Sequence, residues 1–344
     1  MTAFLNVREP GLHTTVQDRG RFGFRAAGVP VSGPLDRVGL RLANALVGNP
    51  DATPALEIML RGPVLEVAAD SVRVALAGCD GVLEIRGEPA RKVPAGRSVR
   101  LVRGTTFAIA TTGQSACGYL AVEGGIDVPA VLGSAATYVR GGLGGCDGRA
   151  LRAGDRIALR SGAARERAER AFAQPFDLQA DAPVRVVPGP QADYFDAAAF
   201  ATFVGSEYTV SAQADRMGFR LDGPRIEHAH GFDLVSDGIV SGAIQVPGSG
   251  MPIVLMADAQ TTGGYPKIAT VISADLPVLA RRKPGARLRF AAVSVLDAER
   301  ARRDQENDLR RCAGSLVEVR AHATVDVAAL HTKNLVSGVV HVPG

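Results

Sequence analysis

Short apolar runs, separated by glycine and other turn residues, dominate the first half of the chain. After an opening strand over residues 1–8 and a polar loop over 13–33, the pattern predicts seven strands, at residues 55–59, 64–67, 72–77, 81–85, 98–102, 106–110 and 116–122. Regularly spaced short strands with turn signals between them are typical of a β-sandwich or barrel. The sequence therefore predicts a mainly β protein.

Helical spacing is confined to a few segments. Residues 36–47 predict a helix, because Leu40, Ala43 and Leu46 share one face; Pro34 precedes it and Gly48 ends it. The charged run at 163–172 predicts a surface helix in a linker, and residues 193–203 a short helix. Residues 295–311 predict a polar amphipathic helix with a solvated face.

A chain of 344 residues exceeds the usual size of one core, so we expect two domains. The expected division is an N-terminal domain over 1–162, a linker helix over 163–182, a C-terminal domain over 183–293 and a helical and strand-like tail over 294–344. Within the tail, residues 316–321 and 335–342 are strand-like. The C-terminal domain is expected to open with strands at 184–188 and 207–211.

Composition excludes several classes of protein. There are 39 basic and 35 acidic residues, no basic run and no interleaved aromatics, so we expect no nucleic-acid partner. The first residues lack the apolar stretch of a signal peptide, and no run of about 18 apolar residues exists, so we expect a cytoplasmic protein without a membrane span. The four cysteines form no CxxC pair, which disfavours a metal site.

The stretch from 242 to 276 carries the densest candidate chemistry. An apolar strand at 252–256 and another at 268–272 enclose a polar loop that contains Asp258, Gln260, Thr261, Thr262, Tyr265 and Lys267. A hairpin with a long turn is the alternative, and Gly263-Gly264 suits a turn. We favour a ligand site, because a turn does not need an amide, two hydroxyls, a phenol and an ammonium.

Within this stretch, Lys267 is the first candidate. It follows Pro266 and precedes an apolar strand, so its stem is expected to be partly buried. A desolvated lysine can carry a proton or stabilise developing negative charge. Gln245 and Gln260 can hold a carboxamide through paired donor and acceptor atoms.

Each of three other segments has both a purely structural and a functional interpretation. Asp215-Arg216 could orient a carboxylate or amide substrate, or Asp215 could simply cap a turn. Gln17 and Asp18 lie in a glycine-containing loop that either approaches a ligand or forms a surface ion network. Ser32 and Asp36 border a helix start, which can bind an anion or be complemented by Asp36 itself.

Several familiar catalytic motifs are missing. The sequence contains no GxSxG, HExxH or Walker A motif, and the glycine run at 141–145 lacks a following GK[ST]. We therefore interpret that run as a loop and not as a phosphate cradle.

Six segments together resemble the allophanate hydrolase subunit 2 family, which is also described as biotin-dependent carboxyltransferase-like, as KipA-like or as the C subunit of 5-oxoprolinase. They read TTVQDRGRFGF, GVPVSGPLDRVGLRLANALVGN, LAVEGGIDVPAVLGS, YVRGGLGGCDGRALRAGD, ADRMGFRLDGP and IQVPGSGMPIVLMADAQTTGGYPKIATVISADL. The likeness runs from roughly residue 3 to 292. The resemblance implies two tandem cyclophilin-like β-barrels. It also implies partners: an allophanate hydrolase subunit 1 (KipI-like) protein and a LamB/YcsF-like protein.

The resemblance implies three functions. The leading hypothesis is the C subunit of an ATP-dependent 5-oxoprolinase, with ATP bound somewhere in the complex. One alternative is the carboxyltransferase half of a biotin-dependent urea or amide carboxylase, although the chain has no biotinyl-lysine motif. The other is a non-catalytic KipA-like regulator that binds a KipI-like protein.

Residue roles follow from a substrate that is a small amide or lactam. We expect Lys267 and Arg216 to stabilise negative charge, and Asp215 or Asp258 to move a proton or recognise an N–H group. The expected substrate-binding residues are Gln245, Gln260, Thr261, Thr262, Tyr265, Gln17, Asp18, Ser32 and Asp36.

Overall fold

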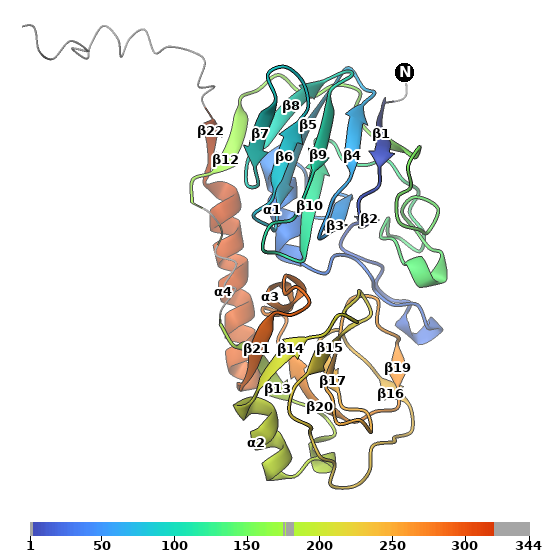
Figure 1. Ribbon diagram of the computed structural model, residues 1–344, viewed down its shortest axis with the longest axis vertical. Coiled ribbons are helices and arrows are strands. Elements are labelled where there is room, and N and C mark those ends of the chain that lie inside the picture. Colours follow the sequence, from blue (N-terminus) through green and yellow to red (C-terminus); the bar gives the residue numbers. More distant parts are fainter. Residues whose placement is uncertain (1–2, 175, 177–181, 320–344) are drawn as a thin grey trace, which may run out of the picture.

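The computed structural model describes residues 3–174, 176 and 182–319 and shows a mainly β protein in two halves (Figure 1). Four α-helices occur in this part of the chain: α1 (Arg37–Val47), α2 (Ala197–Gly205), α3 (Leu276–Ala280) and α4 (Val295–Gly314). Three short 3₁₀ turns accompany them: η1 (Arg25–Ala27), η2 (Val139–Gly141) and η3 (Ala192–Tyr194). None of these helices is long and apolar enough to cross a membrane.

The N-terminal half consists of two sheets over one core. The six-stranded sheet has the order β11 (Arg156–Leu159), β1 (Ala3–Glu9), β4 (Val64–Val67), β9 (Thr106–Ile109), β6 (Val82–Ile85) and β7 (Arg91–Pro94). The five-stranded sheet has the order β2 (His13–Gln17), β3 (Ala55–Met59), β10 (Cys117–Val122), β5 (Ser71–Ala77) and β8 (Ser98–Val102). Leu5, Leu56 and Phe107, all fully buried, belong to the core that the two sheets share.

The C-terminal half contains a closed seven-stranded barrel. Its order is β13 (Val184–Pro188), β20 (Lys267–Val271), β17 (Ala243–Gln245), β18 (Ile253–Leu255), β15 (Gly218–Asp222), β14 (Glu207–Val210) and β21 (Arg287–Ala292). Two small ribbons lie outside it: β16 (Asp237–Gly238) pairs with β19 (Thr262–Gly263), and β12 (Glu169–Phe172) pairs with β22 (Leu316–Val319).

Helix α1 joins the two halves. Asp36 caps its start by accepting hydrogen bonds from the amides of Val38 and Gly39, and Gly48 ends it in the left-handed region at φ 78°. Its apolar face packs on β10 and β5 and belongs to a core cluster that continues into the C-terminal barrel. In Figure 1, α1 lies behind the strands of the N-terminal half, α3 lies between the halves, and α4 runs along one side of both.

The predicted mainly β class is confirmed, and the seven predicted strands of the first half all form. Residues 13–17, expected to begin a loop, instead form β2, whose side chains are buried except for that of His13. The polar threonines and glutamine give this strand no apolar pattern, because these side chains are buried through hydrogen bonds. The hydrophobicity pattern therefore did not predict it. The helix predicted at 36–47 and the one at 295–311 are confirmed as α1 and α4.

The helix expected at 163–172 is wrong. Its last four residues form β12, which pairs with β22 near the end of α4. Glu169 accepts hydrogen bonds from Nε of the fully buried Arg73, at 3.0 and 3.1 Å, and from Ser98 Oγ at 2.5 Å. This tertiary ion pair favours an extended chain over the local helix propensity.

The hairpin alternative for 252–272 is also wrong. Strands β18 and β20 do not pair with each other, because β17 lies between them and pairs with both. The segment between them crosses β17 and contributes β19. Of the tail, residues 316–319 form β22, while the strand-like run at 335–342 lies outside the described residues.

Candidate functional site

Lys267 begins β20 with its ammonium group in an ion pair. Its Nζ lies 2.9 Å from Oδ2 of Asp237, which precedes Gly238 in β16. The Lys267 side chain is 4% exposed and that of Asp237 55% exposed, so the pair reaches solvent through its carboxylate. The hydrogen bond from Lys267 lowers the pKa of Asp237. The prediction that the lysine stem is buried is confirmed.

The neutral carboxamide of Gln191 bonds to both members of this ion pair. Its Nε2 donates to Asp237 Oδ2 at 3.3 Å, and its Oε1 accepts the backbone N–H of Lys267 at 3.3 Å. One glutamine therefore fixes both the carboxylate and the strand that carries the lysine, which holds the charged pair at the rim of the barrel.

Two carboxamides converge beside the charged pair. Gln245 is paired with Lys267 across β17 and β20, at a shift of register. A Cβ atom on Gly263 would lie 2.7 Å from Nε2 of Gln245 and 3.4 Å from Nε2 of Gln260. The same Cβ atom would lie 2.5 Å from Cδ1 of Ile239, so any side chain at this position would displace the ends of neighbouring side chains, the Gln245 amide among them. We call Gln191, Asp237, Gln245, Gln260 and Lys267 the lysine cluster.

The other predicted residues of this loop border the lysine cluster. Gln260 and Thr262 are exposed, and Tyr265 is 40% exposed. The carbonyl of Thr261 accepts the N–H of Ile239, and that of Tyr265 accepts from Gln245 Nε2 at 3.4 Å. Lys267 and Gln245 are buried, whereas Asp237, Gln260 and Tyr265 reach solvent. Together they offer amide donors and acceptors and one ammonium, a set that suits a planar amide whose oxygen gains negative charge.

Arg216 and Asp258 lie in a different place, the seam between the two halves. Nε and Nη2 of Arg216 bond to the two oxygens of Asp258 at 2.8 and 2.9 Å, and Nη2 also donates to the carbonyl of Gly33 at 2.8 Å. Nη1 bonds to Glu57 of β3. Burial alone would lower the pKa of Arg216, but the two carboxylates raise it above its ordinary value. The catalytic roles of Arg216 and Asp258 stay predictions.

Glu57 anchors further groups at this seam. Its Oε2 accepts from the hydroxyl of Tyr119 at 2.5 Å and from the N–H of Leu35 at 2.8 Å, and the Tyr119 oxygen accepts the N–H of Asp36 at 2.8 Å. Burial raises the pKa of Tyr119 well above its usual range. These bonds connect the start of α1 to the central strands β3 and β10.

Asp36 also forms the second ion pair of the seam. Its Oδ2 lies 2.6 Å from Nη2 of Arg281, the residue that follows α3. Burial raises the pKa of Asp36, while Arg281 and the amides of Val38 and Gly39 act against it. Asp36 thus caps α1 and binds the C-terminal half, and its role as a substrate ligand stays a prediction.

The remaining predicted residues are separate from the lysine cluster. Asp215 accepts from the amides of Met217 and Gly218 and is more than half exposed. Asp18 is buried and accepts from Ser134 Oγ at 2.5 Å and from the amides of Gly20 and Ala135. Both accept from local amides, as capping carboxylates do.

Gln17 and Ser32 each hold a buried polar atom with no hydrogen bond to the described residues. Nε2 of Gln17 donates to Thr15 Oγ1 and to the carbonyl of Thr137, whereas its Oε1 has no partner among those residues. Oγ of Ser32 likewise has none. Such atoms in a folded protein call for an explanation, which a ligand or water can supply.

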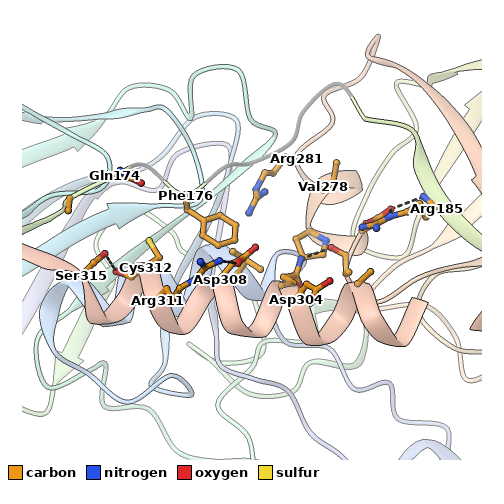
Figure 2. A pocket seen from close by; sticks show the side chains of 17 residues that line it. Gln174, Phe176, Arg185, Val278, Arg281, Asp304, Asp308, Arg311, Cys312 and Ser315 are labelled. Carbon is orange, nitrogen blue, oxygen red and sulfur yellow. Dashed lines mark hydrogen bonds and ion pairs between the residues drawn. The ribbon is translucent and has the colours of Figure 1, made fainter. Parts of the chain in front are cut away.

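A cavity of about 690 Å³ lies along α4, between α4 and α3 (Figure 2). Its charges are largely paired within its own wall: Arg185 Nη2 lies 2.7 Å from Asp275, and Arg311 pairs with Asp308. This cavity contains none of the predicted site residues.

The glycine run at 141–145 does not fit a nucleotide phosphate. The amides of Gly142, Leu143 and Gly145 donate to the carbonyls of Val139, Tyr138 and Ala135, so they are not available to phosphate oxygens. Among the residues that the structure describes, no group of three or more His, Cys, Asp and Glu side chains could hold a metal ion.

A protein-family model described as carboxyltransferase domain, subdomain A and B, matches residues 27–292. The chain belongs to the carboxyltransferase domain family. This carboxyltransferase-domain chain is 38% identical over 313 residues to the C subunit of 5-oxoprolinase from Escherichia coli (strain K12), an alignment that covers 91% of the chain and 98% of that protein. The family predicted from the sequence motifs is confirmed.

Solved structures give the same result. The crystal structure of TTHA0988 superposes with a TM-score of 0.75 and 38% identity, over 84% of this chain and 55% of that one, so the chain spans about half its length. The K. lactis urea amidolyase superposes with a TM-score of 0.80 and 29% identity, over 92% of this chain and 20% of that one.

Sequence reasoning missed Asp237, Gln191 and Glu57. The Asp237-Gly238 pair before β17 was a usable signal, because an acid beside a glycine often marks a special turn. Gln191 and Glu57 carry no local signal, since each acquires its function only through partners far away in the sequence.

Proposed function

We propose that this chain is the C subunit of an ATP-dependent 5-oxoprolinase, which opens 5-oxoproline to L-glutamate. The observation that carries the proposal is the alignment with the Escherichia coli relative across 98% of its length at 38% identity. The urea amidolyase is more distant in sequence, and the chain corresponds to only 20% of it. A match over nearly the whole length of the relative favours the 5-oxoprolinase subunit over the urea amidolyase.

The lysine cluster suits the substrate of such an enzyme. Opening 5-oxoproline requires water to add to the lactam carbonyl carbon, the C–N bond to break and the nitrogen to take a proton. Negative charge then develops on the carbonyl oxygen, where the Lys267 ammonium can stabilise it. Gln245 and Gln260 can hold the planar N–C=O group through their donor and acceptor atoms. Asp237, partly exposed beside Lys267, is placed to accept a substrate N–H.

We propose that ATP binds elsewhere in the complex. Hydrolysis of ATP supplies the free energy that drives ring opening, but three amides of the glycine run, those of Gly142, Leu143 and Gly145, are bonded internally. We therefore place the nucleotide on a partner or at an interface. The partners under this proposal are a KipI-like protein and a LamB/YcsF-like protein, and the complex is cytoplasmic.

Reconstitution tests the proposal. The chain is co-expressed with the KipI-like and LamB/YcsF-like partners, and ATP-dependent release of glutamate from 5-oxoproline is measured with urea and bicarbonate as a parallel substrate pair. We expect glutamate release that disappears when this chain is omitted. Undiminished release from the two partners alone would refute the role proposed here.

The carboxyltransferase alternative is supported by the TM-score of 0.80 with urea amidolyase. It predicts ATP-dependent consumption of bicarbonate with urea once a biotin carboxylase and a biotinylated carrier are supplied. A KipA-like regulator predicts no turnover of either substrate, together with tight binding of the KipI-like protein.

A further inference from the structure

We infer that a second cavity, at the seam between the two halves, binds a small organic anion that has a carboxylate or phosphate head on an apolar body. This seam cavity has a volume of about 690 Å³. The loop before α1, α1 itself, segments next to β17 and β18, the start of α3, and α4 all contribute to its wall. It shares no lining residue with the lysine cluster, so this inference is independent of the proposed function.

The wall of the seam cavity carries positive charge without matching carboxylates. Arg19, Arg25 and Arg37 line it, and none of the three forms an ion pair or a side-chain hydrogen bond with another described residue. Asp51 is the one acidic residue in the wall as the structure describes it, and its Oδ2 lies 2.6 Å from Nε of Arg41. Three guanidinium groups are therefore left for an anion.

Two other arginines, Arg41 and Arg302, interact unfavourably with Arg37 in this wall. Burial lowers the pKa of Arg37, although the residue is exposed at the surface; Arg302 and Arg41 act in the same direction, and Asp36 opposes them. Both neighbours bond to Glu306, Arg41 at 2.7 Å and Arg302 at 3.6 Å. An arriving anion would relieve this repulsion, and a guanidinium fork matches the oxygens of a carboxylate or phosphate.

Ser32 provides an independent observation. It is 5% exposed, it lines the seam cavity, and its Oγ is buried without a hydrogen bond to the described residues. Its backbone adopts φ +54°, and its N–H donates across the seam to the carbonyl of Ala257 at 3.2 Å. This left-handed conformation keeps Ser32 in the wall of the cavity, with a hydroxyl that has no partner among the described residues.

The floor and rim of the cavity are apolar. Leu35, Leu40 and Met256 are buried in the wall, while Phe22 is 61% and Val240 55% exposed at its rim. Neighbouring exposed apolar side chains around a cavity indicate a surface that a ligand covers. The volume lies within the range of about 300–1,000 Å³ that small-molecule sites occupy.

Calorimetric titration of the full chain tests this inference with four probes. Octanoate and octyl phosphate carry both a charged head and an apolar body, whereas inorganic phosphate lacks the body and 1-octanol lacks the charge. We expect saturable one-to-one binding of octanoate, octyl phosphate or both, and the stronger of the two identifies the head group. Absence of saturable binding by both, or equal affinity for either control probe, would overturn the inference.

Two variants and a matched control locate the site. The double variant Arg25→Gln/Arg37→Gln should weaken the better probe by about tenfold or more, since charged hydrogen bonds are lost. Ser32→Gly removes the hydroxyl and suits a positive φ, so the fold is kept while affinity falls several-fold. Arg220→Gln, which changes an exposed arginine on β15, should leave binding unchanged. Equal affinity in the wild type and the double variant, with equal melting temperatures, would place the ligand elsewhere.

Discussion

Arg216 illustrates how one buried side chain can join two halves of a protein. Its guanidinium bonds to Asp258 in the C-terminal half and to Glu57 and the Gly33 carbonyl in the N-terminal half. All three charged side chains are almost fully buried, at 7% exposure or less. Removing the arginine therefore leaves two carboxylates without compensation in a dry environment.

We predict that Arg216→Leu lowers the free energy of unfolding by about 3–5 kcal/mol, the usual cost of breaking a buried ion pair from one side. Urea unfolding monitored by circular dichroism measures it. The matched control, Arg220→Leu, alters an exposed arginine and should stay within about 0.5 kcal/mol of the wild type. Equal losses of unfolding free energy in the two variants would show that the seam is hydrated and that the ion pairs of Arg216 contribute little to stability.

Two tyrosines allow a sharper test of the seam. Tyr119 donates to Glu57 and accepts from Asp36, whereas the buried hydroxyl of Tyr208 has no hydrogen bond to the described residues. Tyr119→Phe should cost about 1–3 kcal/mol of unfolding free energy, and Tyr208→Phe should be neutral or stabilising. Chemical denaturation of both variants side by side measures the difference. A larger loss for Tyr208→Phe than for Tyr119→Phe would contradict this assignment of bonds.

At the residue scale, the sequence indicated which side chains matter but not how they are grouped. It placed Asp215 and Arg216 together because they are adjacent. In the folded chain Asp215 caps a turn at the surface, whereas Arg216 is buried against Glu57, 159 positions away. The two residues lie in the turn before β15, where their side chains have separate partners, so adjacency in sequence is no guide to shared chemistry.

Helix α4 shows the same limit at the scale of an element. Its polar composition predicted a solvated helix, and only Leu309 is fully buried. Half-buried residues nevertheless recur with helical spacing on the face toward the protein: Ala298, Ala301, Arg302, Gln305, Glu306 and Cys312. The contact stripe is made largely of alanines and charged groups, so a hydrophobicity pattern could not reveal it.

Glu306 joins α4 to α1 through Arg41, and its protonation should change the free energy of unfolding. The hydrogen bond from Arg41 lowers the pKa of Glu306 from its ordinary 4.5 to about 2. A carboxyl whose pKa is depressed on folding stabilises the protein above the ordinary pKa, and this contribution is lost as the pH falls toward about 2. Glu306→Gln should cost about 1 kcal/mol at pH 7, and the difference from wild type should shrink below pH 4.5.

Urea unfolding at pH 7, 5 and 3 measures this dependence. The control is Glu299→Gln on the same helix, an exposed side chain 3.6 Å from Arg303, for which we expect no measurable change at any of the three pH values. A cost for Glu306→Gln that grows on acidification would reverse the sign and contradict the ion-pair assignment.

At the scale of the whole molecule, the two halves share one core. The cluster that includes Leu46 and Tyr119 of the N-terminal half continues to Phe203 and Ile268 of the C-terminal half. The ion pairs of Arg216 and Arg281 cross the same seam. Neither half could expose this surface at low cost.

We therefore predict a single cooperative unfolding transition in differential scanning calorimetry, although the strands form two separate groups. Arg216→Leu should move that transition to lower temperature without splitting it. Two well-separated transitions in the wild type would mean that the halves unfold independently and that the shared core contributes little.

The sequence predicted the family and the mainly β class of the whole molecule because strands and motif blocks are local features. It could not predict the seam, because Glu57 meets Arg216 and Asp36 meets Arg281 only after both halves have folded. The lysine cluster was predicted in part: Lys267, Gln245 and Gln260 lie within one stretch of sequence, while Gln191 and Asp237 enter from segments before it.

Turnover of the assembled complex tests the central claim most directly. Glutamate release from 5-oxoproline with ATP is compared for the wild type, Lys267→Met and Lys92→Met, the last being an exposed lysine paired only with Glu84 at 3.3 Å among the described residues. We predict that Lys267→Met lowers kcat by about 100-fold or more with an unchanged melting temperature, and that Lys92→Met behaves like the wild type. Full activity of a folded, complex-forming Lys267→Met variant would contradict a role for the lysine cluster in the reaction.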